Sequence, residues 1–135
     1  MTTFSDSALS HVSLGTDDFD RAVAFYDRVL APLGIRRVDG FPGGAGWGRR
    51  WPEFWVQLPI DGRPAAVGNG THVAFLAPDR AAVEAFHRAG IEAGARCDGP
   101  PGVRPQYSQH YFAAFLRDPD GHKIEAMCWE GPAPM

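Results

Sequence analysis

The feature that most limits the possible folds of this chain is an internal repeat with an offset of 61 residues. Residues 71–76, Thr-His-Val-Ala-Phe-Leu, repeat the pattern of residues 10–15, Ser-His-Val-Ser-Leu-Gly, and Phe86-His87 follows Phe25-Tyr26 at the same distance. An offset shared by a predicted strand and by the helix after it indicates a duplication. We therefore expect one domain over residues 1–135, built from module 1 (about residues 8–62) and module 2 (about residues 70–130).

Each module is predicted to contain a strand, a helix and then further strands. In module 1 we expect strands over residues 9–16, 35–38 and 54–60, and a helix that Asp17 or Asp18 caps and that Pro32 and Gly34 end. Residues 39–51 are rich in glycine and are predicted to form a mobile or substrate-facing loop, and residues 61–70 a linker.

Module 2 is expected to follow the same plan, with a helix over residues 79–93 and a long loop over residues 98–109. Residues 111–117 and 124–129 are apolar strands joined by Asp-Pro-Asp-Gly, a sequence typical of a tight turn. The expected fold class is α+β, with two tandem βαβββ modules that form a curved mixed sheet around a central cleft and helices outside.

Glu125 is a carboxylate in the middle of an otherwise apolar strand. Alternation places it on one face of the strand with Lys123, Met127 and Trp129, opposite Ile124, Ala126 and Cys128. A buried, unpaired carboxylate would cost several kcal/mol, so Glu125 needs a cation, a metal ion or a network of hydrogen-bond donors.

Three further residues are expected on the strand faces that point away from the helices: His11, Gln57 and His72. With Glu125 they form a set of nitrogen and oxygen ligands suited to one divalent ion, namely Ni, Zn, Mn, Fe or Mg. A lone histidine is more often structural, but the repeat-equivalent placement of His11 and His72 favours a metal site. Gln57 fits either a fourth ligand or a hydrogen-bond partner of a ligand.

Aromatic residues and one more histidine are candidates for a substrate pocket: Trp47, Trp55, Tyr107 and His110. The aromatic rings fit the protein core equally well. His122, beside the predicted turn, is expected in solvent.

Composition excludes several classes of partner. The net charge is −3 and no basic face is visible, so we expect neither nucleic-acid nor membrane binding. Residues 1–10 are polar, no apolar run reaches transmembrane length, and the two cysteines lack CxxC spacing, so a cytoplasmic location is expected. The expected partner is a small-molecule substrate.

The chain resembles the vicinal oxygen chelate superfamily, which includes glyoxalase I, extradiol dioxygenases, fosfomycin-resistance enzymes, methylmalonyl-CoA epimerase and the bleomycin-resistance proteins. The resemblance covers residues 8–129 and rests on His11 with the Phe25-Tyr26 helix, on His72, and on Asp-Pro-Asp-Gly-His-Lys-Ile-Glu at residues 118–125. It implies a metal ion at His11, His72 and Glu125, with Gln57 where some members have a fourth ligand. It also implies a homodimer.

The sequence departs from the glyoxalases of this superfamily at two positions. Gly15 stands where an arginine would hold glutathione, and Gln57 stands where bacterial members carry a carboxylate. An epimerase of this superfamily would need a second carboxylate base in module 1, and only Asp39 lies near the expected position. For a dioxygenase, His110 and either Tyr107 or Tyr111 would have to surround the metal ion.

Three functions follow from these residues. The first is a metal-dependent lyase or isomerase, in which Glu125 removes a proton next to a carbonyl and the metal ion stabilises the enediolate. The second is an Fe or Mn ring-cleaving dioxygenase of the extradiol type. The third is a metal-free small-molecule binding or resistance protein, which the joint presence of His11, His72 and Glu125 disfavours.

Overall fold

The computed structural model describes residues 7–132, and they form two βαβββ modules in tandem, as the repeat predicts. Module 1 contains β1 (Val12–Gly15), α1 (Phe19–Leu30), a 3₁₀ turn η1 (Ala31–Leu33), β2 (Arg36–Phe41), β3 (Gly44–Gly48) and β4 (Phe54–Gln57). Module 2 contains β5 (His72–Leu76), α2 (Arg80–Glu92), β6 (Arg96–Val103), β7 (Tyr111–Arg117) and β8 (Lys123–Trp129).

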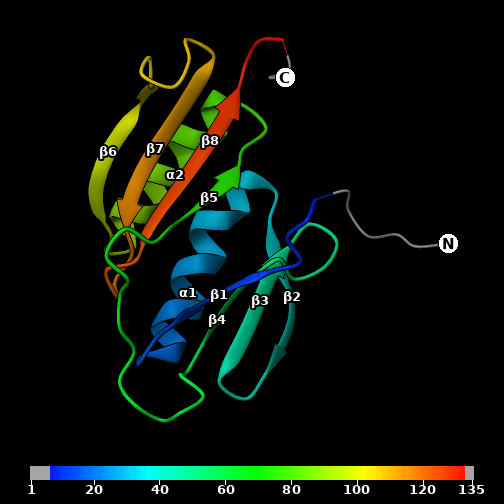
Figure 1. The fold of residues 1–135 in the computed structure, drawn as a ribbon, viewed down its shortest axis with the longest axis vertical. Helices are drawn as coiled ribbons and strands as arrows, with labels where there is room; N and C mark the ends of the chain where they lie inside the picture. The colour runs from blue at the N-terminus through cyan, green and yellow to red at the C-terminus, as the bar shows by residue number, and fades with distance from the viewer. Residues whose placement is uncertain (1–6, 133–135) are drawn as a thin grey trace, which may run out of the picture.

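The two modules have the same sheet topology. The strand order is β1-β4-β3-β2 in module 1 and β5-β8-β7-β6 in module 2 (Figure 1). In each sheet the first strand pairs in parallel with the last, and the other pairings are antiparallel. The expected modules are therefore confirmed, and their strands form two hydrogen-bonded four-stranded sheets rather than one continuous sheet.

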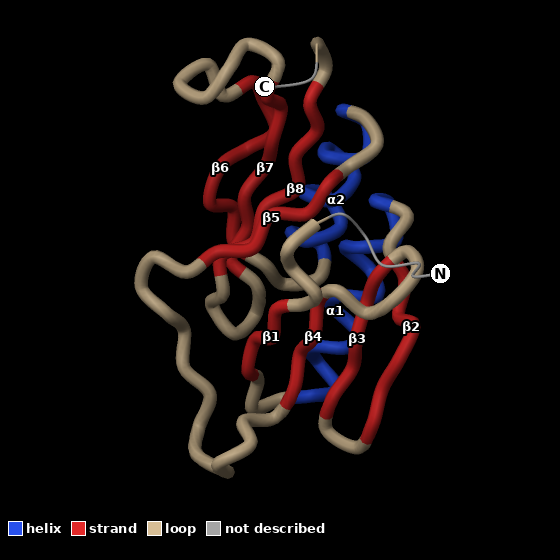
Figure 2. The backbone as a smooth tube through the Cα atoms, turned by 45° about the vertical axis from the view of Figure 1, so that its right-hand side comes forward, coloured by secondary structure: helices blue, strands red, loops and turns tan. Residues whose placement is uncertain are grey.

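Both helices begin at the predicted aspartates. Asp18 caps α1 and accepts a hydrogen bond from the Arg21 N–H, and Asp79 caps α2 by accepting from the Ala82 N–H at 2.8 Å. The helices pack on one side of the strands and bury their apolar faces there (Figure 2). The opposite side of each sheet carries no helix in the described chain, and we call it the open face.

The prediction of a loop over residues 39–51 is wrong, because β2 and β3 form a hairpin there. All five residues of β3 are buried, and Trp47 is fully covered by the core. A Cβ on Gly46 would lie 2.6 Å from the Pro52 Cβ and 2.8 Å from Cε2 of Trp55. Glycine is present here because other side chains lie directly on the strand, not because the segment is mobile.

The predicted loop over residues 98–109 is also shorter than expected. β6 continues to Val103 through Pro100 and Pro101, with shifts of register at two places. β6 is an edge strand, so two prolines can be accommodated without removing hydrogen bonds from the interior of the sheet.

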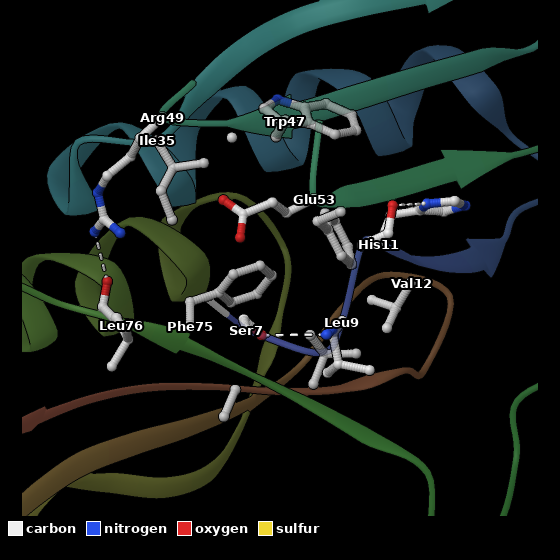
Figure 3. Close-up of a pocket in the computed structure, with 15 residues that line it drawn as sticks. Ser7, Leu9, His11, Val12, Ile35, Trp47, Arg49, Glu53, Phe75 and Leu76 are labelled. Atoms are coloured by element: carbon white, nitrogen blue, oxygen red, sulfur yellow. Dashed lines mark hydrogen bonds between the residues drawn. The ribbon is translucent and has the colours of Figure 1, made fainter. Parts of the chain in front are cut away.

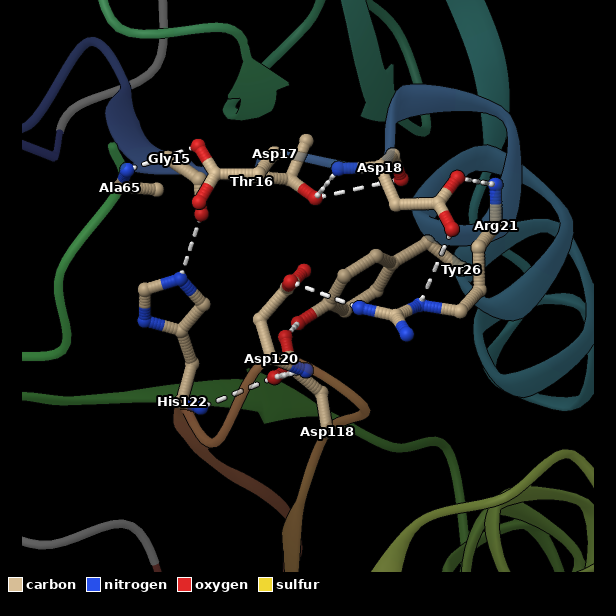
Figure 4. Close-up of polar contacts among 10 residues, drawn as sticks. All are labelled: Gly15, Thr16, Asp17, Asp18, Arg21, Tyr26, Ala65, Asp118, Asp120 and His122. Atoms are coloured by element: carbon tan, nitrogen blue, oxygen red, sulfur yellow. Dashed lines mark hydrogen bonds and ion pairs between the residues drawn. The ribbon is translucent and has the colours of Figure 1, made fainter. Parts of the chain in front are cut away.

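The β7–β8 turn joins the modules (Figure 4). The Tyr26 hydroxyl donates to Oδ2 of Asp118 at 2.5 Å, and Arg21 donates to Asp120 at 2.9 Å. His122 is not in solvent as predicted: it is buried, with Nε2 2.7 Å from the Gly15 carbonyl oxygen. Burial raises the pKa of both Tyr26 and Asp118. Much of the Asp-Pro-Asp-Gly-His sequence therefore holds module 2 against module 1.

Candidate metal and substrate site

Glu125 lies on the open face of module 2 with both carboxylate oxygens engaged. The residue is only 2% exposed. Oε1 lies 3.1 Å from Nε2 of His72, and Oε2 accepts a hydrogen bond of 2.5 Å from the Tyr111 hydroxyl. The requirement for partners around this carboxylate is thus met by an imidazole and a phenol.

Tyr111 is the residue of this group that the sequence did not single out as a partner. Burial first, and then the hydrogen bond to Glu125, raise its pKa. The register of β7 against β8 pairs Phe115 with Glu125 and Tyr111 with Trp129. Tyr111 therefore shares the open face with Glu125, and the alternation of the predicted hairpin contained that signal.

His11 directly precedes β1 in module 1. Its side chain is exposed, and Nδ1 lies 2.9 Å from the Ser10 hydroxyl oxygen. His11, Trp55 and Gln57 line a common hollow together with five other residues: Ser10, Ser13, Phe41, Trp51 and Pro52. The structure thus brings together the two candidate ligands of module 1.

Strand pairing shows which residues of the two modules correspond at this hollow. Ala74 pairs with Glu125 in module 2, and its repeat equivalent Ser13 pairs with Trp55 in module 1. Gln57 pairs with Gly15, two residues further along the strand. Gln57 therefore does not occupy the position of module 1 that matches Glu125, and the indole of Trp55 lies where module 2 has its carboxylate.

The candidate ligands are divided between two sheets. His72 and Glu125 belong to the β5–β8 sheet, whereas His11 and Gln57 belong to module 1. Within residues 7–132, no three His, Cys, Asp or Glu side chains lie close enough together to hold a metal ion. The donor types nevertheless fit a divalent ion, because Glu125 offers a desolvated carboxylate beside an imidazole that is 43% exposed.

A cavity of about 220 Å³ lies between the modules and is distinct from the Glu125 group (Figure 3). Trp47 lies at its wall but belongs to the core, where its indole N–H donates to Asp27 at 2.9 Å. Arg49 links the modules across this region by donating to the carbonyl oxygens of Leu33 and Leu76 at 2.7 and 2.8 Å.

The remaining predicted pocket residues, Tyr107 and His110, lie just before the first residue of β7. Tyr107 is 63% exposed, and its ring packs on Tyr111 with 5.1 Å between centroids. His110 is held by the Glu130 carbonyl oxygen, 2.8 Å from Nδ1, and packs on Trp129. Tyr107 is thus a neighbour of the Glu125 group, whereas His110 has structural contacts.

Comparison with known proteins agrees with this architecture. The sequence pattern of the Glyoxalase/Bleomycin resistance protein/Dioxygenase superfamily matches residues 8–126. The chain belongs to this superfamily. The superfamily includes metal-dependent enzymes. Separately, none of the helices within residues 7–132 of this glyoxalase-like protein has the length and apolar character needed to span a membrane.

Three individual proteins are similar to this glyoxalase-like chain over most of its length. It is 31% identical over 121 residues to the metallothiol transferase FosB of Shouchella clausii, with 88% of this chain and 78% of that protein covered. A glyoxalase/bleomycin resistance protein from Albidiferax ferrireducens is 38% identical with a TM-score of 0.82, over 92% of this chain and 100% of that one. A lactoylglutathione lyase from Agrobacterium tumefaciens shares the fold at 24% identity and a TM-score of 0.63, over 90% and 93% of the two chains.

Proposed function

We propose that this protein is a metal-dependent enzyme acting on a small molecule, and that its site is assembled from two chains. His11 of one copy and His72 with Glu125 of the other would bind one divalent ion. The division of these residues between two open faces supports this arrangement, because a symmetric dimer can place module 1 of each copy opposite module 2 of its partner. Each dimer would then contain two sites.

The proposed ion would supply Lewis-acid activation of an oxygen atom on the substrate. The protein's own residues would fix that ion and shape its surroundings. Tyr111 donates a hydrogen bond to Oε2 of Glu125, and the other carboxylate oxygen, Oε1, faces His72. Trp55 forms an apolar wall, and Gln57 lies further along the strand, where its amide can contact substrate.

The reaction best supported is the transfer of a nucleophile, such as a thiol, to an activated electrophile. The observation that carries this proposal is Trp55 in the module 1 position that matches Glu125, since a thiol transfer needs no second carboxylate base. Similarity over most of the chain to a metallothiol transferase supports the same class.

A lyase or isomerase that removes a proton next to a carbonyl is the second candidate. Glu125 would be its base, and one observation favours that role. Glu125 is buried, and within residues 7–132 neither Arg nor Lys forms an ion pair with it. Because Trp55 lies at the matching position of module 1, the substrate proton would be removed and returned by Glu125 alone.

The test begins with the metal content and metal affinity of the full chain. A panel of substrates follows, with a small thiol plus alkyl halide, epoxide or enone electrophiles in one arm and hemithioacetals, 2-substituted acyl thioesters and catechols in the others. We expect metal-dependent consumption of thiol. A protein that binds no divalent ion would contradict the proposal and leave the binding or resistance role.

The Glu125→Gln variant then separates the two reaction classes. If Glu125 acts only as a ligand, excess metal ion should restore most of the lost rate. If it is the base, turnover at saturating metal should stay lower by a factor on the order of 10²–10⁴.

A further inference from the structure

Cationic side chains surround Phe115, the residue paired with Glu125 on the open face of module 2. The guanidinium carbon of Arg104 lies 5.3 Å from the centroid of the Phe115 ring, and Nζ of Lys123 lies 5.2 Å from it. The imidazole of His72 is 6.3 Å from the same ring. Two cations therefore flank the surface next to the proposed metal ligands.

Arg104 is oriented by two backbone carbonyl groups and has no counter-charge in the described chain. It donates to the Pro100 carbonyl oxygen at 2.7 Å and to the Gly102 carbonyl oxygen at 2.9 Å. No carboxylate within residues 7–132 forms an ion pair with it. Backbone carbonyls orient the guanidinium without neutralising it, so its charge remains available to a ligand.

Lys123 is also incompletely neutralised. Its only carboxylate partner in the described chain is Asp98, at 3.9 Å, and Arg117 already binds that carboxylate at 3.0 Å. Two cations, Arg117 and Lys123, thus share one aspartate, in a protein whose net charge is −3. A local excess of positive charge against the overall sign favours an anionic ligand.

We propose that Arg104 and Lys123 form an oxyanion-binding site over Phe115, which receives a carboxylate or phosphate-type group of the substrate. This deepens the proposed function, because the anionic group would lie beside His72 and Glu125 while another oxygen of the substrate is activated there. Binding of the anion alone requires only the two cations, so it can be tested without a metal ion.

Lys123 is the only lysine of the chain, which permits a direct measurement. Reductive methylation with ¹³C-formaldehyde gives one dimethyl-lysine signal, keeps the positive charge, and leaves the N-terminal amine as the other labelled group. Loss of the signal in Lys123→Arg assigns it. In metal-free full-length protein at constant ionic strength, we expect inorganic phosphate to shift this signal saturably, with a midpoint on the order of millimolar.

Other ligands and variants sharpen the test. Acetate in place of phosphate distinguishes carboxylate from phosphate-type recognition, and uncharged trimethyl phosphate should leave the signal in place. Arg104→Gln should weaken phosphate binding on the order of tenfold, and the exposed Arg88→Gln should leave it unchanged. Circular dichroism checks that each variant is folded.

Three results would overturn the inference: a shift linear in phosphate concentration, an equal shift with trimethyl phosphate, or unchanged affinity in folded Arg104→Gln. Metal binding measured in the same preparations separates this outcome from failure of the proposed function. Retained metal binding without an anion response would remove only the oxyanion site, and the converse would remove only the metal site.

Discussion

Tyr111 donates a 2.5 Å hydrogen bond to Oε2 of Glu125, while Oε1 of the same carboxylate lies 3.1 Å from His72. The two oxygens therefore have different surroundings before any ion binds. A phenol on one oxygen orients the carboxylate and favours metal coordination through the other. Partners of this kind commonly contribute tenfold or more to metal affinity.

Replacing Tyr111 by Phe removes this hydrogen bond and leaves the ring in place. We expect the affinity for a divalent ion, measured by isothermal titration calorimetry, to fall by about tenfold without loss of the fold. Tyr107→Phe is the matched control, because its ring packs on Tyr111 and the residue is largely exposed. Equal affinities of Tyr111→Phe and the unmodified protein would mean that Tyr111 has no role at the site.

The strand register predicts that Gln57 is not a metal ligand. Gln57→Ala should therefore change the metal dissociation constant by less than about threefold, whereas His11→Ala should raise it by about 100-fold or more because a ligand is lost. The same titrations measure both. A large loss of affinity in Gln57→Ala would show instead that the amide binds the ion directly.

Much of the fold could be predicted because local and repeated signals agree. The two capped amphipathic helices and the β7–β8 hairpin follow from periodicity, capping and turn residues. β3 could not be found this way, since Gly-Ala-Gly-Trp-Gly has almost no side chains to alternate, and Trp55 packs over it only in the folded chain.

The candidate site was less accessible to sequence reasoning. Residue types and the repeat indicate His11, His72 and Glu125. The loops of the two modules differ in length, so the sequence alone does not show which residue of module 1 matches Glu125. The pairing of β1 with β4 identifies that residue as Trp55 rather than Gln57. A single sequence also cannot show that ligands in two modules lie on separate sheets.

The Asp118 carboxyl group should make stability depend on pH. Burial raises its folded-state pKa above the usual 3.8, so the folded protein holds this proton more tightly than the unfolded chain. The stability contributed by the protonated group is fully present below pH 3.8, and it is lost as the pH rises through the raised pKa of the folded state.

Urea unfolding of the unmodified protein and of Asp118→Asn, at several pH values between about 4 and 7, isolates this effect. We expect the stability of the unmodified protein relative to the variant to decrease with rising pH, by about 1.4 kcal/mol per unit of pKa shift. A relative stability that rises with pH would mean that the hydrogen bonds to Asp118 outweigh its desolvation.

The close packing of Trp55 on β3 can be tested with Gly46→Ala. The added methyl group would meet Pro52 and Trp55, so we expect a loss of about 1–3 kcal/mol in the free energy of unfolding. Gly40→Ala is the control, because its nearest contact is the Gly44 carbonyl oxygen at 3.3 Å. Similar stabilities for the two variants would contradict the packing described for β3.

Mixing two inactive variants tests most directly whether the metal site is shared between chains. His11→Ala and His72→Ala each remove one ligand from every site of a homodimer. If the ligands come from two copies, a mixed dimer regains one complete site, and random exchange gives such dimers in about half of the population. Native mass spectrometry counts the mixed dimers, and calorimetry counts the bound ions. The account predicts that each variant alone binds the ion about 100-fold more weakly or worse, and that the mixture recovers up to about a quarter of the original high-affinity capacity. Mixed dimers that form but recover no metal binding would contradict it.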